Sequence, residues 1–262
     1  MQSKDPLRLR TTIGSARHFY HDICASCSKL IPKADSVLLY YITDRTAFPG
    51  DARARRTRLL DKIAEAASQQ INYIQLREKD LSSRDLEALA LEAMQIIGEK
   101  RKLTTDHWPP ATALLINSRT DVALATAADG VHLQSNDISP QEVRTAWNRS
   151  CGAGAFAREN SPQNPLISVS CHNPQELAQA AANEATFAVF APVFEKKDAQ
   201  PTGLEALSQA CRSPIPVLAL GGVTVQNAQS CLQAGAAGIA AIRLFQENNI
   251  ATVVRQLRPE RA

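Results

Sequence analysis

Four charged side chains and an amide follow one short apolar run, in the segment from Gln75 to Asp80, whose sequence is Gln-Leu-Arg-Glu-Lys-Asp. Arg77 and Lys79 are two residues apart, and on an extended chain such side chains point to the same side. A pair of cations suits a diphosphate, whose oxygens accept charge-assisted hydrogen bonds. A solvated charged turn before a helix near Ser83 is the alternative, so the assignment depends on the surrounding elements.

Eight apolar runs rich in β-branched residues recur from residue 37 onward and predict strands. They are Val37–Ile42, Ile71–Leu76, Thr112–Ile116, Gly130–Leu133, Leu166–Ser170, Thr186–Phe190, Ile215–Leu220 and Gly238–Ile242. The segments between them have apolar residues at three- and four-residue spacing, which predicts helices. Among these segments are Thr57–Ser68, Leu86–Ile97, Pro174–Ala182, Leu204–Cys211 and Val225–Ala234.

Strands that alternate with helices, and that are too apolar to have a face in water, indicate a parallel sheet covered by helices. We therefore predict an α/β fold, a single (β/α)8 TIM barrel over residues 37–262. Residues 1–36 are expected to form a short N-terminal extension, helical or poorly ordered. A doubly wound open sheet is the alternative, but the turn from Thr43 to Thr46 lacks the Gly-x-Gly-x-x-Gly pattern of dinucleotide-binding sheets.

Charge and hydropathy exclude two classes of function. Of the 262 residues, 44% are hydrophobic, and the formal net charge is +3. The extension contains six Lys/Arg and three Asp/Glu, so the rest of the chain carries 23 charges of each sign, which argues against nucleic-acid binding. No apolar run approaches the 18 residues of a membrane span. The N-terminus also lacks the apolar core of a secretory signal, so we expect a cytoplasmic protein, with an organellar transit peptide left open.

In a TIM barrel the loops after the strands form the active site, and here those positions are polar or glycine-rich. They include Asn117 to Arg119, His132 to Asp137, Ser170 to Asn173, Glu195 to Asp198 and the pair Gly221-Gly222. A glycine pair after the seventh strand, followed by a helix, predicts a phosphate site built from backbone amides. The sequence thus predicts one cationic anion site near the second strand and one amide-based site near the seventh and eighth.

Motifs in register from about residue 37 to 245 carry a family resemblance. They are Tyr41 to Asp44, Gln75 to Asp80, Asn117 with Asp121 to Ala125, Ala128 to Leu133, Ser170 with His172, Ala191 to Phe194, Gly203-Leu204 and Ala219 to Val223. Together they resemble the thiamine phosphate synthase and TenI family.

The resemblance implies a Mg²⁺-dependent transferase that joins hydroxymethylpyrimidine diphosphate to a thiazole phosphate, giving thiamine phosphate and diphosphate. In that chemistry diphosphate leaves first, and the thiazole nitrogen attacks the resulting pyrimidine cation. Cations and Mg²⁺ stabilise the charge that develops on the leaving group. The implied partners are therefore small phosphorylated pyrimidine and thiazole molecules, and a homo-oligomer is left open.

The resemblance also implies a role for each matching residue. The pyrimidine and its diphosphate are assigned to Gln75, Arg77, Lys79, Asn117 and Ser170. Mg²⁺ is assigned to Asp137, and the thiazole phosphate to Gly222 and the backbone near Ile242 and Arg243. His172 matches a position that the tautomerase branch uses as acid and base, a role for which the near-neutral pKa of imidazole is suited.

Three departures from the synthase pattern keep alternatives open. Ser118 stands where synthases have a second magnesium-binding Asp, and Arg243 stands where they have a small hydroxyl residue. The loop after the sixth strand is shorter, although its Lys196 and Lys197 are expected to reach the diphosphate. Ser118 and this loop favour a TenI-like thiazole tautomerase or a non-catalytic regulatory member, whereas the intact segment from Arg77 to Lys79 and Asp137 favour the synthase, which we expect first.

Overall fold

The computed structural model describes residues 37–103, 112–152, 164–194 and 200–258. Within these ranges eight parallel strands close into a barrel in sequence order. The strands are β1 (Leu38–Ile42), β2 (Tyr73–Leu76), β3 (Ala113–Asn117), β4 (Gly130–Leu133), β5 (Leu166–Cys171), β6 (Phe187–Phe190), β7 (Val217–Ala219) and β8 (Gly238–Ala241). The predicted TIM barrel is confirmed, and the prediction for residues 1–36 lies outside the described residues.

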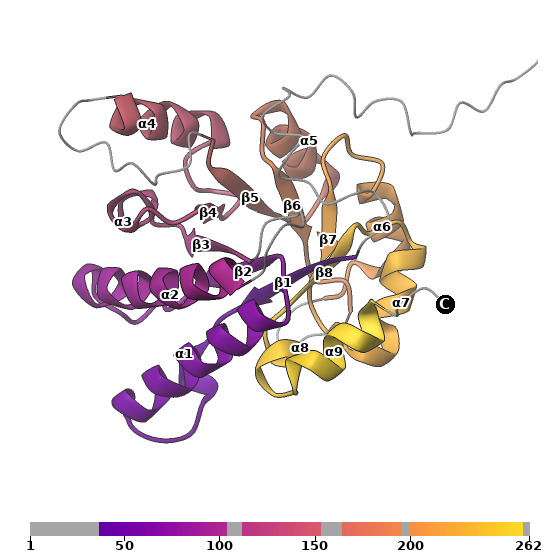
Figure 1. Ribbon diagram of the computed structural model, residues 1–262. Coiled ribbons are helices and arrows are strands. Elements are labelled where there is room, and N and C mark those ends of the chain that lie inside the picture. The colour runs from indigo at the N-terminus through magenta and orange to yellow at the C-terminus, as the bar shows by residue number, and fades with distance from the viewer. Residues whose placement is uncertain (1–36, 104–111, 153–163, 195–199, 259–262) are drawn as a thin grey trace, which may run out of the picture.

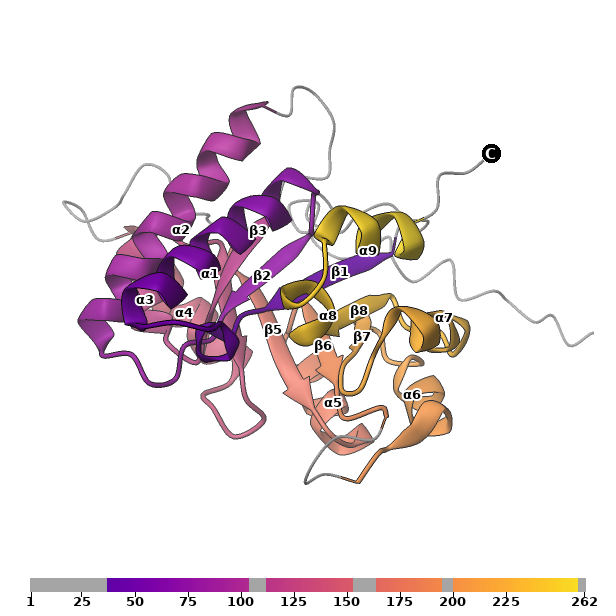
Figure 2. The same cartoon turned by 90° about the horizontal axis from the view of Figure 1, so that it is seen from below.

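Helices surround the strands on the outside of the barrel, as Figure 1 and the turned view in Figure 2 show. They are α1 (Ala52–Ser68), α2 (Ser83–Leu103), α3 (Thr120–Thr126), α4 (Pro140–Gly152), α5 (Pro174–Ala182), α6 (Gly203–Ala210), α7 (Val225–Gln233), α8 (Arg243–Gln246) and α9 (Ile250–Leu257), with a short 3₁₀ turn η2 (Arg45–Ala47) after β1. Across the described ranges, none of these helices combines the length and the apolar character needed to cross a membrane.

Helix α1 begins five residues earlier than the apolar spacing predicted, at Ala52 instead of Thr57. The reason is a local cap: the Asp51 side chain accepts a hydrogen bond from the backbone N–H of Ala54 at 2.8 Å. A side-chain acceptor at this position satisfies an N–H group that has no partner within the helix. The arginine-rich first turns are therefore helical although they have few apolar residues.

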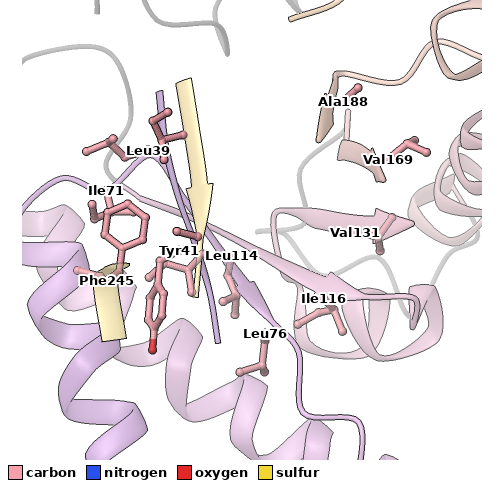
Figure 3. Packing of buried hydrophobic residues seen from close by; sticks show 14 of the residues in the cluster. Leu39, Tyr41, Ile71, Leu76, Leu114, Ile116, Val131, Val169, Ala188 and Phe245 are labelled. Carbon is pink, nitrogen blue, oxygen red and sulfur yellow. The ribbon is translucent and has the colours of Figure 1, made fainter. Parts of the chain in front are cut away.

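Strand residues alternate between two hydrophobic layers. Leu39, Tyr41, Leu76 and Ile116 pack outward against the helices, where Phe245 of α8 contacts the Tyr41 ring (Figure 3). The other set points inward and fills the barrel: Leu38, Tyr40, Tyr73, Leu115, Leu166, Phe187 and Leu218. Because the side chains of a strand alternate with period two, the inward positions near the carboxyl ends are fixed by this pattern. They are Gln75, Asn117, His132 and Ser170.

Candidate active site

Gln75 and Asn117 lie at the carboxyl ends of neighbouring strands β2 and β3, and their side chains meet. Nε2 of Gln75 donates to Oδ1 of Asn117 at 2.7 Å. Gln75 is only 1% exposed, and its Oε1 has no hydrogen-bond partner among the described residues. A buried acceptor without a donor costs free energy, so this oxygen is suited to receive an N–H group of a bound ligand.

Arg77 follows β2 on the same inward side as Gln75 and is half-buried, whereas Lys79 is exposed. Within the described residues, no carboxylate forms a salt bridge with either cation. Two cations without counter-ions at one strand end are suited to an anionic ligand. Their assignment to a diphosphate stays a prediction that this geometry supports.

Glu78, between the two cations, points to the opposite side of the chain. Thr43 Oγ1 donates to its Oε1 at 2.6 Å, and the backbone N–H of Arg45 donates to its Oε2 at 3.0 Å. Burial raises the pKa of Glu78 above its usual value, although these hydrogen bonds favour the carboxylate. Glu78 thus holds the loop after β1 in place and leaves the two cations unneutralised.

Asp137, in the loop after β4, contacts Ser118, which follows β3. Ser118 Oγ donates to Oδ2 of Asp137 at 2.7 Å, and the backbone N–H of Gln134 donates to the same oxygen at 2.8 Å. No described residue donates to the second carboxylate oxygen, Oδ1. One open carboxylate oxygen fits Mg²⁺, which binds through one or two carboxylates and fills its other positions with water and phosphate oxygens.

Few protein groups are available to hold a metal ion at Asp137. Within the described ranges, no group of three or more His, Cys, Asp and Glu side chains is placed to hold a metal ion. Ser118 occupies the position where a second carboxylate would stand, and its hydroxyl is already engaged with Asp137. The affinity of Asp137 for Mg²⁺ would therefore depend strongly on oxygens that the ligand supplies.

His132 joins three other polar side chains into a hydrogen-bonded chain across the barrel interior. Its Nδ1 lies 2.7 Å from Oγ of Ser168, its Nε2 lies 2.8 Å from Oγ of Ser170, and the Tyr40 hydroxyl lies 3.3 Å from both Nδ1 and Ser168 Oγ. Burial, reinforced by the charge of Arg77, lowers the pKa of His132 to about 3. The imidazole is therefore neutral at physiological pH.

The glycine pair after β7 offers backbone donors instead of side chains. Gly221 and Gly222 have φ angles of +97° and +63°, a conformation that favours glycine. Asn227 Nδ2 donates to the carbonyl of Gly222 at 3.0 Å, and Asn227 also forms a capping box with Thr224 at the start of α7. In the described chain, no hydrogen bond uses the backbone N–H of Gly222 or Val223, so both are open to an anion.

Two further predicted contacts lie near this second site. Ile242 is half-buried at the end of β8, and Arg243 is exposed on the first residue of α8. The pairing of Ala219 with Ile239 sets the ends of β7 and β8 beside each other. Lys196 and Lys197, predicted to reach the diphosphate, lie outside the described residues.

His172 is exposed just beyond β5 and takes no part in the His132 chain. Its Nδ1 lies 2.7 Å from the backbone carbonyl oxygen of Ala191. Because a carbonyl only accepts, Nδ1 carries the proton and Nε2 is left as a base. Cys171 beside it is buried on the outward face, as expected from strand alternation.

The residues that sequence reasoning missed are Tyr40 and Ser168, together with the inward position of His132. Tyr40 is part of an apolar run, and its polar partners lie 92 and 128 positions away in the sequence. One local signal was present: Ser168 and Ser170 alternate with apolar residues on β5, which indicates a polar inward face.

A closed parallel barrel with polar side chains and free backbone donors at the carboxyl ends of its strands defines the chain as an enzyme-type (β/α)8 barrel. The chain belongs to the thiamine monophosphate synthase family, whose family model matches residues 39–245. The resemblance read from the motifs is thus confirmed.

Individual relatives cover most of this chain. It is 33% identical over 226 residues to the thiamine-phosphate synthase of Methanoculleus marisnigri, covering 84% of this chain and 93% of that protein. It is 36% identical over 210 residues to the thiamine-phosphate synthase of Roseiflexus castenholzii, covering 78% of this chain and 79% of that one. Among solved structures, a thiamine phosphate pyrophosphorylase from Pyrococcus furiosus is similar with a TM-score of 0.65 at 26% identity, covering 86% of this chain and 95% of that one.

Proposed function

We propose that this chain condenses hydroxymethylpyrimidine diphosphate with a thiazole phosphate, giving thiamine phosphate and diphosphate. The observation that carries the proposal concerns two groups that have no partner among the described residues: the buried acceptor Gln75 Oε1 and, two residues further along, the cation of Arg77. The acceptor suits an N–H group on the pyrimidine, and the cation suits the diphosphate. One substrate presents both chemistries.

The reaction divides between the two sides of the barrel rim. Arg77 and Lys79 hold the diphosphate and stabilise its charge as the bond between the pyrimidine methylene carbon and the diphosphate oxygen breaks. The amide of Asn117 and the hydroxyl of Ser170 are further donors on that side. The N–H groups after Gly221 hold the thiazole phosphate, so that the thiazole nitrogen lone pair forms the new bond to the methylene carbon. No proton is transferred, so no general base is required.

Mg²⁺ dependence is part of the proposal. Asp137 would hold the ion through its open oxygen. When bound, Mg²⁺ neutralises charge on the diphosphate. We also propose a cytoplasmic location, which cell fractionation would test.

A ³¹P NMR assay with both precursors tests the function. The purified protein should release diphosphate and form thiamine phosphate when Mg²⁺ is present, and should stop when a chelator is added. No turnover with saturating precursors and Mg²⁺ would contradict the synthase and favour a non-catalytic, regulatory role.

The unmatched acceptor offers a sharper test with a matched control. Gln75→Met removes Oε1 and should lower kcat/KM for the pyrimidine substrate about tenfold or more, because a buried hydrogen bond is lost. The variant also loses the hydrogen bond from Nε2 to Asn117, so its free energy of unfolding should fall by about 1 kcal/mol. Thr112→Val removes another buried unpaired oxygen, just before β3 at the opposite end of the barrel, and should leave kcat/KM unchanged. Equal losses in both variants would contradict a ligand contact at Gln75.

A second candidate is thiazole tautomerisation, and the geometry of His172 favours it. Its Nδ1 is tied to Ala191, which leaves Nε2 as an exposed base. If this is the reaction, His172→Gln should abolish tautomerisation while phosphate binding persists. A fully active variant would remove His172 as the acid and base.

A further inference from the structure

In the buried polar chain from Tyr40 to Ser170, the number of protons and acceptors determines which group donates each hydrogen bond. Three groups contact one another at its inner end: the Tyr40 hydroxyl, the Ser168 hydroxyl and Nδ1 of His132. Both hydroxyls carry a proton, because burial raises the pKa of Tyr40 well above its usual value and serine does not ionise. Each of these protons needs an acceptor in the dry interior of the barrel.

Only one tautomer of His132 gives every proton of these three groups a hydrogen-bond acceptor. If Nδ1 is bare, Ser168 donates to Nδ1 and Tyr40 donates to Ser168 Oγ, so both hydroxyl protons are bonded. If Nδ1 carries the proton, the three groups hold three protons but have acceptors for two, and one buried donor is left without a partner among the described residues. The unpaired donor would cost free energy, so the bare Nδ1 is favoured.

The proton of the neutral imidazole then sits on Nε2 and points at Ser170. Nε2 lies 2.8 Å from Ser170 Oγ, and a protonated Nε2 can only donate. The hydroxyl proton of Ser170 is therefore directed away from His132, and the half-buried Ser170 has no described acceptor for it. In the opposite tautomer the Ser170 hydroxyl would donate to Nε2. It would then present only lone pairs to the ligand, and lone pairs repel an anion.

We propose that His132 is a positioning residue, fixed as the Nε2–H tautomer by the Ser168 and Tyr40 hydroxyls, which makes Ser170 an obligatory hydrogen-bond donor to diphosphate. The inference rests on the proposed contact of Ser170 with the diphosphate. The new element is the role of the two buried hydroxyls beneath the site. By fixing the His132 tautomer they make Ser170 a donor, which favours a ligand atom that can only accept, such as a phosphate oxygen. Either hydroxyl alone can still occupy Nδ1, so the two are redundant.

The tautomer can be measured in the free protein, without turnover. In ¹⁵N NMR of the histidine-labelled protein, with the His132 signals assigned by loss in His132→Gln, Nε2 should be protonated and Nδ1 should be a hydrogen-bonded acceptor. A protonated Nδ1 would overturn the proposal, whatever reaction the protein catalyses.

The link to the ligand is tested by calorimetric titration with inorganic diphosphate and Mg²⁺. Tyr40→Phe and Ser168→Ala should each change the dissociation constant less than about threefold, whereas the double variant should weaken binding about tenfold or more. The double variant of Ser168→Ala with Tyr73→Phe removes as many hydroxyls from the barrel interior but keeps Tyr40, and should bind like Ser168→Ala alone.

A Ser170→Ala background completes the cycle. Because the hydroxyls act through Ser170, adding Tyr40→Phe and Ser168→Ala to Ser170→Ala should cause no further loss of diphosphate affinity. The same loss in both backgrounds would overturn the relay. Unchanged diphosphate binding in Ser170→Ala alone would overturn the contact on which the inference rests, while a failed synthase assay with intact binding would affect only the proposed reaction.

Discussion

The two sides of the barrel rim, each of which we propose binds an anion, present different parts of the chain. From β2 to β5 the polar atoms belong to side chains: Gln75, Arg77, Asn117, His132 and Ser170. At β7 and β8 they belong to the backbone, where Gly221 and Gly222 adopt positive φ angles and the N–H groups of Gly222 and Val223 have no partner among the described residues. A side-chain site can be retuned by single substitutions, whereas a backbone site is fixed by the conformation of its loop.

The two halves also differ in how a substitution would act on them. Ser118, which the family resemblance places where synthases have a carboxylate, lies on the side-chain half and donates to Asp137. On the backbone half, an added Cβ at Gly221 would lie 2.7 Å from Cα and Cβ of Pro192. The side-chain half can therefore accept changes of side-chain chemistry, whereas the backbone half accepts little change in the conformation of its loop.

The largest expected effect is the loss of the half-buried cation. Arg77→Ala should lower kcat/KM by roughly 100-fold, or about 3 kcal/mol, since one preorganised charge partner of the leaving group is removed. Arg84→Ala removes an exposed cation of the same charge from the first turn of α2 and should change the rate little. Losses of similar size in the two variants would show that only the general field matters, and that the side-chain site is not specific.

On the backbone side, Gly221→Ala should lower the free energy of unfolding by about 2–3 kcal/mol, because of its positive φ and the contact with Pro192. Gly98→Ala, in α2, meets no atom within 4 Å and should raise stability by about 0.5–1 kcal/mol. Urea denaturation measures both. A Gly221→Ala variant as stable as the parent would mean that the loop is not fixed in this conformation.

Acid should lower the free energy of unfolding through His132, a residue of the side-chain half whose pKa is lowered from 6.5 to about 3. Between these values the unfolded chain binds a proton that the folded chain does not, so stability falls as the pH drops. The fall is up to about 1.4 kcal/mol per pH unit. From pH 6.5 to 4.5 the parent should therefore lose about 2 kcal/mol more than His132→Gln in urea denaturation. Parallel losses would contradict a buried neutral imidazole.

The smallest expected effect comes from adding a carboxylate beside Asp137, at the proposed Mg²⁺ site. Ser118 has a φ angle of +54°, which Asp and Asn accept more readily than most residues. Ser118→Asp should lower the Mg²⁺ concentration for half-maximal activity about fivefold, or roughly 1 kcal/mol, through the added charge beside Asp137. Ser118→Asn has nearly the same shape without the charge and should not. Equal Mg²⁺ requirements in the two variants would place the ion elsewhere.

The fold was predictable because each strand is a short run of apolar residues, buried on both faces. The bounds of β4 and α5 agree with the sequence prediction residue for residue, and α1 differs because its start depends on the Asp51 cap instead of on apolar spacing. The inward set at the rim could also be predicted in part, since period-two alternation places Gln75 and Arg77 together and turns Glu78 away.

The remainder of the site depends on contacts between distant strands. The partners of His132 lie on β1 and β5, and strand spacing on one segment does not show which hydroxyls meet its ring. Likewise, the unpaired state of Gln75 Oε1 follows from Asn117 taking up only the amide N–H. Such features come from tertiary packing. A sequence motif therefore indicates which residue lies in the site, but not which of its atoms carries a proton or lacks a hydrogen-bond partner.

The division of the rim into two anion sites is tested most directly by calorimetric titration of Arg77→Ala with each anion separately. Inorganic diphosphate with Mg²⁺ should bind to this variant at least about tenfold more weakly than to the parent protein, while the affinity for thiazole phosphate is unchanged. Equal losses of affinity for both anions, or no loss for diphosphate, would contradict this division.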